Sequence, residues 1–170
     1  MLLLKKLASP EVVKKFQEKY PDADIPSISD FMQIMRSASD LSEALNKLLD
    51  EHALLQGRWW VLVLLTRQDD LISCPSSLAE DAGVTKATMT GFISGLEREG
   101  YITRIIDPLD RRKYCIQLTE AGINKVNQVM PIFYKRVKNL MDAIDSKQRT
   151  EVVEGIRVLA QHQDLLKADK

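Results

Sequence analysis

The sequence contains little of what several functional classes require. Its 170 residues include only two cysteines and two histidines, and no two of these four are neighbours in the chain. That scarcity excludes a disulfide framework and any metal site recognisable by its spacing. The chain has no glycine-rich phosphate loop, and its longest apolar run, residues 59–65, is too short to cross a membrane. We therefore expect no metal, no cofactor, no membrane span and no enzymatic activity.

Net charge is also missing, because 24 basic side chains balance 24 acidic ones. The balance is uneven along the chain: residues 1–83 hold 9 basic and 13 acidic side chains, residues 84–118 hold 6 and 4, and residues 119–170 hold 9 and 7. Such a distribution is compatible with nucleic-acid binding but predicts modest non-specific affinity. The first residues, with three leucines before two lysines, do not form a secretory signal, so a cytoplasmic protein is expected.

The most informative stretch runs from residue 74 to residue 122 and begins with two predicted short helices. Pro75, Ser76 and Ser77 suit a helix start, where a serine hydroxyl can accept from free amide groups. Gly83 suits a left-handed helix end, and Thr85 is placed to cap the next helix. Together these signals predict a helix-turn-helix, with Ser76 and Ser77 near DNA.

The second helix, expected at about 86–99, has two distinct faces. Its apolar residues follow a helical spacing and predict the core side: Met89, Phe92, Ile93 and Leu96. The opposite face and the N-terminal end carry small or polar residues: Lys86, Ala87, Thr88, Thr90, Gly91, Ser94 and Arg98. Small side chains allow a helix to enter a major groove, where threonine can contact a base edge or a thymine methyl. An ordinary solvated face is the alternative.

Two extended runs, 101–106 and 113–118, predict a β-hairpin. In the second run Tyr114, Ile116 and Leu118 alternate with Lys113, Cys115 and Gln117, as in a strand with one exposed face. The predicted tip carries Asp110, Arg111, Arg112 and Lys113. An arginine there can enter a minor groove, and Asp110 can brace Arg112. By itself, an arginine pair on a surface hairpin is more often only a solubility feature.

This stretch resembles the MarR family of bacterial winged helix-turn-helix transcription regulators. The resemblance is carried by Trp59-x-Val61-Leu62, Leu78-Ala79, Val84-Thr85-x-x-Thr88-x-Thr90, Leu96-Glu97-x-x-Gly100-Tyr101-Ile102-x-Arg104, Asp107-Pro108-x-Asp110-x-Arg112 and Leu118-Thr119-x-x-Gly122. It implies a mainly α-helical fold with a small β-wing, in which N- and C-terminal helices form a dimerisation arm. It also implies double-stranded DNA and a second copy of the chain as partners.

The flanking sequences predict long amphipathic helices. One is expected at 29–52, with a seam formed by Ile34, Ala38, Leu41, Leu45 and Leu48. Another is expected from Thr119, as N-cap, to about residue 145; Pro131 should kink or loosen it, and its seam comprises Ile123, Val126, Met130, Phe133, Val137, Leu140 and Ile144. A last helix, about 146–166, is expected to bury Val152, Val153, Ile156 and Leu159. Pairing with a second copy would cover both seams, and an intrachain bundle is the alternative.

These patterns divide the chain into four expected regions. Residues 1–28 form an N-terminal extension with a short helix starting at Ser9-Pro10-Glu11 and ending before two prolines. Residues 29–54 form the first part of the dimerisation arm, 55–118 the winged helix-turn-helix, and 119–170 the C-terminal dimerisation helices.

The resemblance further implies a small aromatic or phenolic ligand between arm and winged head. The residues considered for an apolar slot with a cationic end are Met32, Arg36, His52, Arg58 and Trp60. Redox control is a second family mode, but the chain has no cysteine in its first long helix. Cys115 is expected to be packed in a strand, and a structural role is favoured for Cys74. The resulting hypothesis is a ligand-responsive repressor that binds a palindromic operator as a homodimer. The alternative is a winged-helix protein-interaction module or anti-repressor without its own operator.

Overall fold

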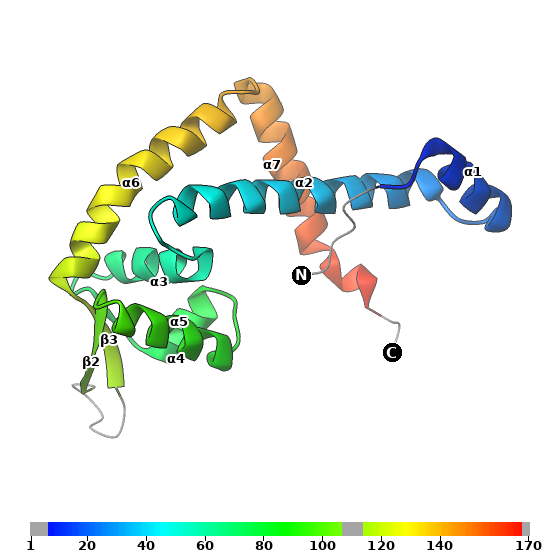
Figure 1. Ribbon diagram of the computed structural model, residues 1–170. Coiled ribbons are helices and arrows are strands. Elements are labelled where there is room, and N and C mark those ends of the chain that lie inside the picture. The colour runs from blue at the N-terminus through cyan, green and yellow to red at the C-terminus, as the bar shows by residue number, and fades with distance from the viewer. Residues whose placement is uncertain (1–6, 107–113, 168–170) are drawn as a thin grey trace. The chain divides into compact units, whose positions relative to one another are not determined.

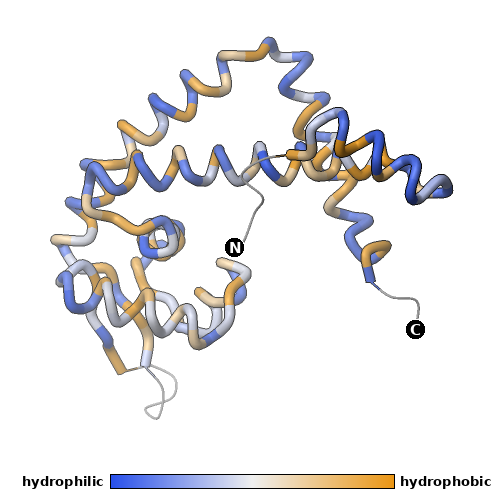
Figure 2. The backbone as a smooth tube through the Cα atoms, turned by 45° about the vertical axis from the view of Figure 1, so that its right-hand side comes forward, coloured by the Kyte–Doolittle hydropathy of each residue, from blue (hydrophilic) through white to orange (hydrophobic). Residues whose placement is uncertain are grey.

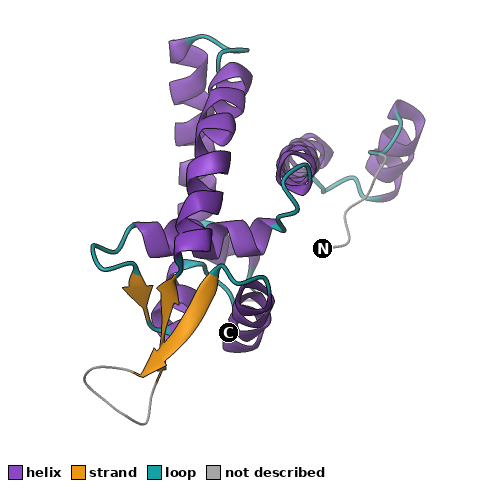
Figure 3. Ribbon diagram, turned by 60° about the vertical axis from the view of Figure 1, so that its left-hand side comes forward, coloured by secondary structure: helices purple, strands orange, loops and turns teal. Residues whose placement is uncertain are grey.

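The computed structural model describes residues 7–106 and 114–167 of the chain. The chain forms two compact units, Met1–Gly122 and Ile123–Lys170. Most of the described chain is helical, and a small three-stranded sheet lies in the first unit (Figures 1 and 3). The expected mainly α-helical class with a small β-sheet is thus confirmed. No helix among the described residues has the length and apolar character needed to span a bilayer.

The N-terminal part consists of helix α1 (Pro10–Lys19) and the long helix α2 (Ile25–Asp50). Ser9 caps α1 as expected, accepting a hydrogen bond from the Val12 amide at 3.5 Å. Helix α2, however, begins four residues earlier than the sequence pattern predicted, because Asp24 caps it and Pro26 fits its first turn. Hydrogen bonds from the Ser27 hydroxyl and amide lower the pKa of the Asp24 carboxyl. Only residues 20–24 separate the two helices.

Helix α3 (Gln56–Thr66) supplies the centre of the hydrophobic core. Trp59, Val61, Leu62 and Leu65 are fully buried, and Leu49 from the end of α2 is buried with them. Such a helix, apolar on most of its circumference, is typical of a core element. Trp59 is therefore a core residue, whereas its neighbour Trp60 is only half-buried.

The sheet has the order β1-β3-β2 and is antiparallel throughout, with strands β1 (Ile72–Ser73), β2 (Ile102–Ile106) and β3 (Tyr114–Leu118). Strand β1 was not predicted from the sequence. The expected alternation along β3 is wrong in part, because Tyr114 is exposed while Cys115 and Ile116 are both buried. Strand β3 is the central strand, so both of its edges are paired, and the burial of the consecutive residues Cys115 and Ile116 shows that both of its faces are covered at this point.

The first unit ends in a tightly bonded corner at the start of helix α6 (Glu120–Met141). The Thr119 hydroxyl donates to the Gly100 carbonyl at 2.7 Å and accepts from the Gly122 amide at 3.1 Å, so Thr119 is the expected N-cap. The Thr119 amide donates to the Tyr101 carbonyl at 3.0 Å. A Cβ at Gly122 would overlap the same Tyr101 carbonyl oxygen. The exit of the sheet is thus packed directly against the residues that follow helix α5 (Lys86–Arg98).

The second unit contains most of α6, helix α7 (Ser146–Gln161) and the 3-10 turn η1 (Gln163–Leu166). Helix α6 ends at Met141, four residues before the expected boundary, and continues through Pro131. Asp145 caps α7 in a reciprocal pair with Gln148. The expectation that α7 buries its apolar residues is wrong for the single chain: Val152, Val153, Ile156 and Leu159 are all exposed. Figure 2 shows hydrophobic and hydrophilic residues alternating along the long helices.

Candidate nucleic-acid interface

The expected helix-turn-helix is formed by α4 (Pro75–Asp81) and α5. Gly83 has a φ of 63°, the left-handed conformation predicted for it, and the next amide, of Val84, donates to the Ala79 carbonyl at 3.0 Å. Thr85 caps α5 by accepting from the Thr88 amide at 3.1 Å. The serine cap predicted for α4 is wrong, because Cys74 is its N-cap and no side chain bonds there. Ser76 and Ser77 lie exposed in the first turn.

One face of α5 is fixed in the core of the first unit. Met89, Ile93 and Leu96 are fully buried, as their spacing predicted, and Phe92 is half-buried beside Gly57. Gly95 lies on the same side, where a Cβ would overlap the Arg58 guanidinium. This packing determines which side of α5 faces solvent.

The exposed side of α5 contains the predicted reading residues, all of which the structure leaves accessible: Lys86, Ala87, Thr88, Thr90, Gly91 and Ser94. The Thr90 hydroxyl donates to the Lys86 carbonyl at 2.8 Å, so its proton is used within the helix. Its oxygen lone pairs and methyl group remain available to a base. A Cβ at Gly91 would meet no atom within 4 Å, which shows that the surface is open at this point.

Arg58, one of the residues considered for a ligand slot, makes a structural contact within the single chain. Its guanidinium forms an ion pair and hydrogen bond with Glu99, just after α5, and both side chains are more than two-thirds buried. Together with its contact at Gly95, this pair connects α3 to the C-terminal end of α5. Arg58 thus positions the exposed face of α5.

A second brace joins the hairpin to α5, and the sequence analysis missed it. The Arg104 Nε on β2 lies 3.1 Å from Glu97 Oε2, and the guanidinium carbon lies 4.9 Å from the centre of the Tyr114 ring on β3. The sequence analysis named Arg104 only as part of the family motif. The spacing of neighbouring residues does not show that β2 will lie beside the end of α5. The hairpin stem is therefore tied to the helix whose outer face is exposed.

The predicted tip residues Asp110, Arg111, Arg112 and Lys113 lie outside the described residues. The stem that carries them is regular, with Ile102 opposite Leu118 and Ile106 opposite Tyr114. The proposed brace between Asp110 and Arg112 stays a prediction.

The five residues considered for a ligand slot do not line a single cavity in the first unit. Met32 lies in a cavity of about 700 Å³ between α1 and α2, whereas Trp60 lies in another, between α3 and α4, of about 410 Å³. Arg36 pairs with Asp40 at 2.6 Å, and neither Arg36, His52 nor Arg58 lines either cavity.

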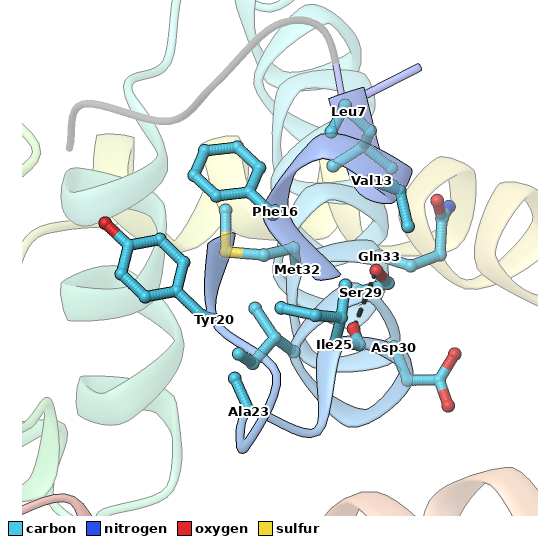
Figure 4. A pocket seen from close by; sticks show the side chains of 12 residues that line it. Leu7, Val13, Phe16, Tyr20, Ala23, Ile25, Ser29, Asp30, Met32 and Gln33 are labelled. Atoms are coloured by element: carbon cyan, nitrogen blue, oxygen red, sulfur yellow. Dashed lines mark hydrogen bonds between the residues drawn. The ribbon is translucent and has the colours of Figure 1, made fainter. Parts of the chain in front are cut away.

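The cavity between α1 and α2 is apolar and includes Phe16 and Tyr20, whose rings stack with their centres 6.2 Å apart (Figure 4). Its lining contains one carboxylate, Asp30, which points away from these rings, and no basic side chain. The expected cationic end for an acidic ligand is therefore not found in this cavity. The described residues also contain no cluster of three or more His, Cys, Asp or Glu side chains that could hold a metal ion.

Comparison with known proteins agrees with this architecture. Residues 56–114 match the model of the MarR family. The HTH-type transcriptional repressor YetL of Bacillus subtilis is 28% identical over 150 residues, which covers 86% of this chain and 87% of YetL.

Two solved structures share the fold. Sco3205, a MarR family transcriptional regulator from Streptomyces coelicolor crystallised in complex with DNA, aligns with a TM-score of 0.69 and 18% identity over 98% of this chain and 94% of its own. Bordetella bronchiseptica BpsR, whose DNA binding is regulated by 6-hydroxynicotinic acid, aligns with a TM-score of 0.66 and 21% identity over 81% and 93%. Together with the capped helix pair, the buried face of α5 and the braced hairpin, these matches show that the chain is similar to the MarR family of winged-helix transcription regulators.

Proposed function

We propose that this protein binds a palindromic duplex operator as a homodimer and acts as a repressor that a small ligand releases. The observation that carries the proposal is the division of α5 between a fully buried apolar face and an exposed face of small polar residues. A helix held this way can place Thr88, Thr90 and Ser94 in a major groove, while Lys86 contacts a phosphate. The hairpin tip then reaches the adjacent minor groove.

A homodimer supplies the second half of this interface. Two copies of α5 have to enter successive major grooves about 34 Å apart, one turn of the duplex. The exposed apolar residues of α2 and α7 support a pairing of this kind. A ligand that binds more tightly to a dimer in which the two α5 helices have a different separation shifts the population away from the DNA-bound form. Regulation of BpsR by an aromatic acid supports this type of control.

The main test is selection of bound duplexes from a random pool by the purified protein, with and without candidate aromatic acids. We expect a palindromic consensus whose half-sites lie one helical turn apart, together with affinity that falls as salt increases. A folded dimer that shows no salt-dependent duplex binding would instead support the protein-interaction alternative.

Replacing Arg112 tests the contribution of the wing. Arg112→Ala should reduce operator affinity by about 1–3 kcal/mol, the range for one specific contact. Lys147→Ala, an equal loss of charge on α7 in the second unit, is the control and should leave affinity nearly unchanged. Fluorescence anisotropy with the selected operator provides the measurement. Wild-type affinity in a folded Arg112→Ala protein would contradict the role of Arg112.

Replacing Thr90 tests base reading by α5. Thr90→Val keeps the shape but removes the hydroxyl, so it should broaden the selected sequence more than it weakens non-specific binding. Thr150→Val is a matched control, because Thr150 makes the same hydrogen bond to a carbonyl four residues earlier, at 3.0 Å, but on α7. An unchanged selection profile for Thr90→Val would remove Thr90 from the reading surface.

A further inference from the structure

The two cysteines of the chain, 41 positions apart in sequence, are brought together in the first unit. The sulfur atoms of Cys74 and Cys115 lie 2.9 Å apart, and both residues are thiols. A disulfide bond has a sulfur–sulfur length of about 2.05 Å, so the two atoms have less than about 1 Å to move before they can bond.

The backbone on both sides holds the two sulfurs in this position. In the antiparallel pair of β1 and β3, Ile72 is opposite Gln117 and Ser73 is opposite Ile116, so continuing the register places Cys74 opposite Cys115. The Leu118 amide donates to the Leu71 carbonyl at 3.0 Å and extends the same ladder. Directly opposed residues of antiparallel strands have Cα atoms about 4.5–5.5 Å apart, which lies within the range that disulfides span.

The surroundings of the two thiols differ in a way that fits a two-step oxidation. Cys74 is partly exposed at the start of α4, whereas Cys115 is 4% exposed on the central strand. An oxidant from solvent therefore reaches Cys74 first, and Cys115 is already in contact with the sulfur that has been oxidised. No third cysteine exists in the chain to compete for this partner.

We propose that Cys74 and Cys115 form a reversible intramolecular disulfide when the protein meets a hydroperoxide. In the first step the Cys74 thiolate attacks one peroxide oxygen and the O–O bond breaks. The products are a sulfenic acid at Cys74 and, with hydrogen peroxide, one water. Cys115 then attacks the Cys74 sulfur, the S–O bond breaks, the S–S bond forms and a second water leaves. The two thiols supply the two electrons that reduce the peroxide. The new bond ties the start of α4 to the central strand of the sheet.

The test is hydrogen peroxide, one equivalent per chain, added to the full-length protein, followed by thiol counting and tryptic mapping. We expect both thiols to be lost, the chain to remain at single-chain size in a non-reducing gel, and dithiothreitol to restore both thiols. Residues 68–86 and 114–125 should appear as one linked peptide, lighter by two hydrogen atoms than the separate peptides together. Disulfide-linked chains, or Cys74 oxidised while Cys115 stays a free thiol, would overturn the proposal.

Two variants separate the steps. Cys115→Ser should accumulate a sulfenic acid at Cys74 that dimedone traps, whereas the wild type should yield no stable adduct because Cys115 consumes it. Cys74→Ser should leave Cys115 almost unreactive because of its burial. Circular dichroism checks that both variants fold, and the wild-type peptide map decides the proposal if either does not. The outcome is independent of DNA binding, so failure of the operator proposal would leave this one intact.

Discussion

The core helices α3 and α5 and the last long helix, α7, contain similar apolar residues but bury them to very different extents. In α3 and α5 most of the large apolar side chains are buried within one chain, and Trp59, Ile93 and Leu96 are wholly inaccessible. In α7 no residue is buried, although Val152, Val153, Ile156 and Leu159 recur with a helical spacing. The region that contains α3, α5 and the hairpin, called the winged region below, therefore has its own core within one protomer. The apolar face of α7 is exposed in the single chain, and in the proposed homodimer a second copy covers it.

The largest expected effect follows from placing a charge on α7. Ile156, about half exposed in one chain, would be buried twice in a symmetric dimer, once from each protomer. Ile156→Glu should weaken association by about 3–6 kcal/mol, because it removes the remaining apolar burial of two half-exposed isoleucines and places two carboxylates in an apolar interface. Sedimentation equilibrium should then show a monomer where the wild type is a dimer. Ile156→Leu, which keeps the apolar area, should remain dimeric.

The same variant tests whether the core around α3 is independent of the apolar face of α7. Ile156→Glu should leave the near-ultraviolet circular dichroism of the buried Trp59 unchanged, because the core around α3 lies within one chain. A wild-type protein that is monomeric at micromolar concentration would contradict the proposal that a second copy covers the apolar face of α7.

The next effect is expected in the core of the winged region. Trp59→Ala should reduce the free energy of unfolding by about 3–5 kcal/mol, because it removes a fully buried aromatic side chain and leaves a cavity. Trp60→Ala is the matched control: the neighbouring residue is half-buried, so its loss should be smaller. Urea denaturation measures both. Equal losses would show that the core is not centred on Trp59.

A smaller effect is expected at two glycines that differ in their surroundings. Gly122→Ala should destabilise the protein by about 1–3 kcal/mol, since its Cβ would overlap a backbone oxygen that cannot easily move. Gly91→Ala, with open space around it in the middle of α5, should stabilise the free protein by about 0.5–1 kcal/mol through helix propensity. Thermal unfolding compares them. A stabilising Gly122→Ala would mean that the corner at Thr119 is loose.

Features that depend only on residues close together in the sequence were predictable. Gly83 and Thr85 fixed the turn and the cap, and the spacing of Met89, Ile93 and Leu96 identified the buried face of α5. These signals depend on local backbone geometry and on one helical period, so they do not require knowledge of distant residues.

Features that depend on distant partners were not predictable. Strand β1 is two residues long and exists only because β3 returns beside it, which also explains the burial of Cys115 and its contact with Cys74. Arg58 was considered only for a ligand slot, because nothing in the neighbouring sequence shows that Glu99 and Gly95 lie next to it. The burial expected on α7 was wrong for the same reason, because helical spacing alone does not show whether another surface of the chain covers an apolar face.

The corner formed by Thr119, Gly122 and the Tyr101 carbonyl connects movement of α6 to the end of α5. Three hydrogen bonds and a close backbone contact immobilise the link between the end of the sheet and the first turn of α6. Reorientation of α6 cannot be absorbed there. A change in the direction of the first turn of α6 would therefore be transmitted to Gly100 and Tyr101, and so to the C-terminal end of α5.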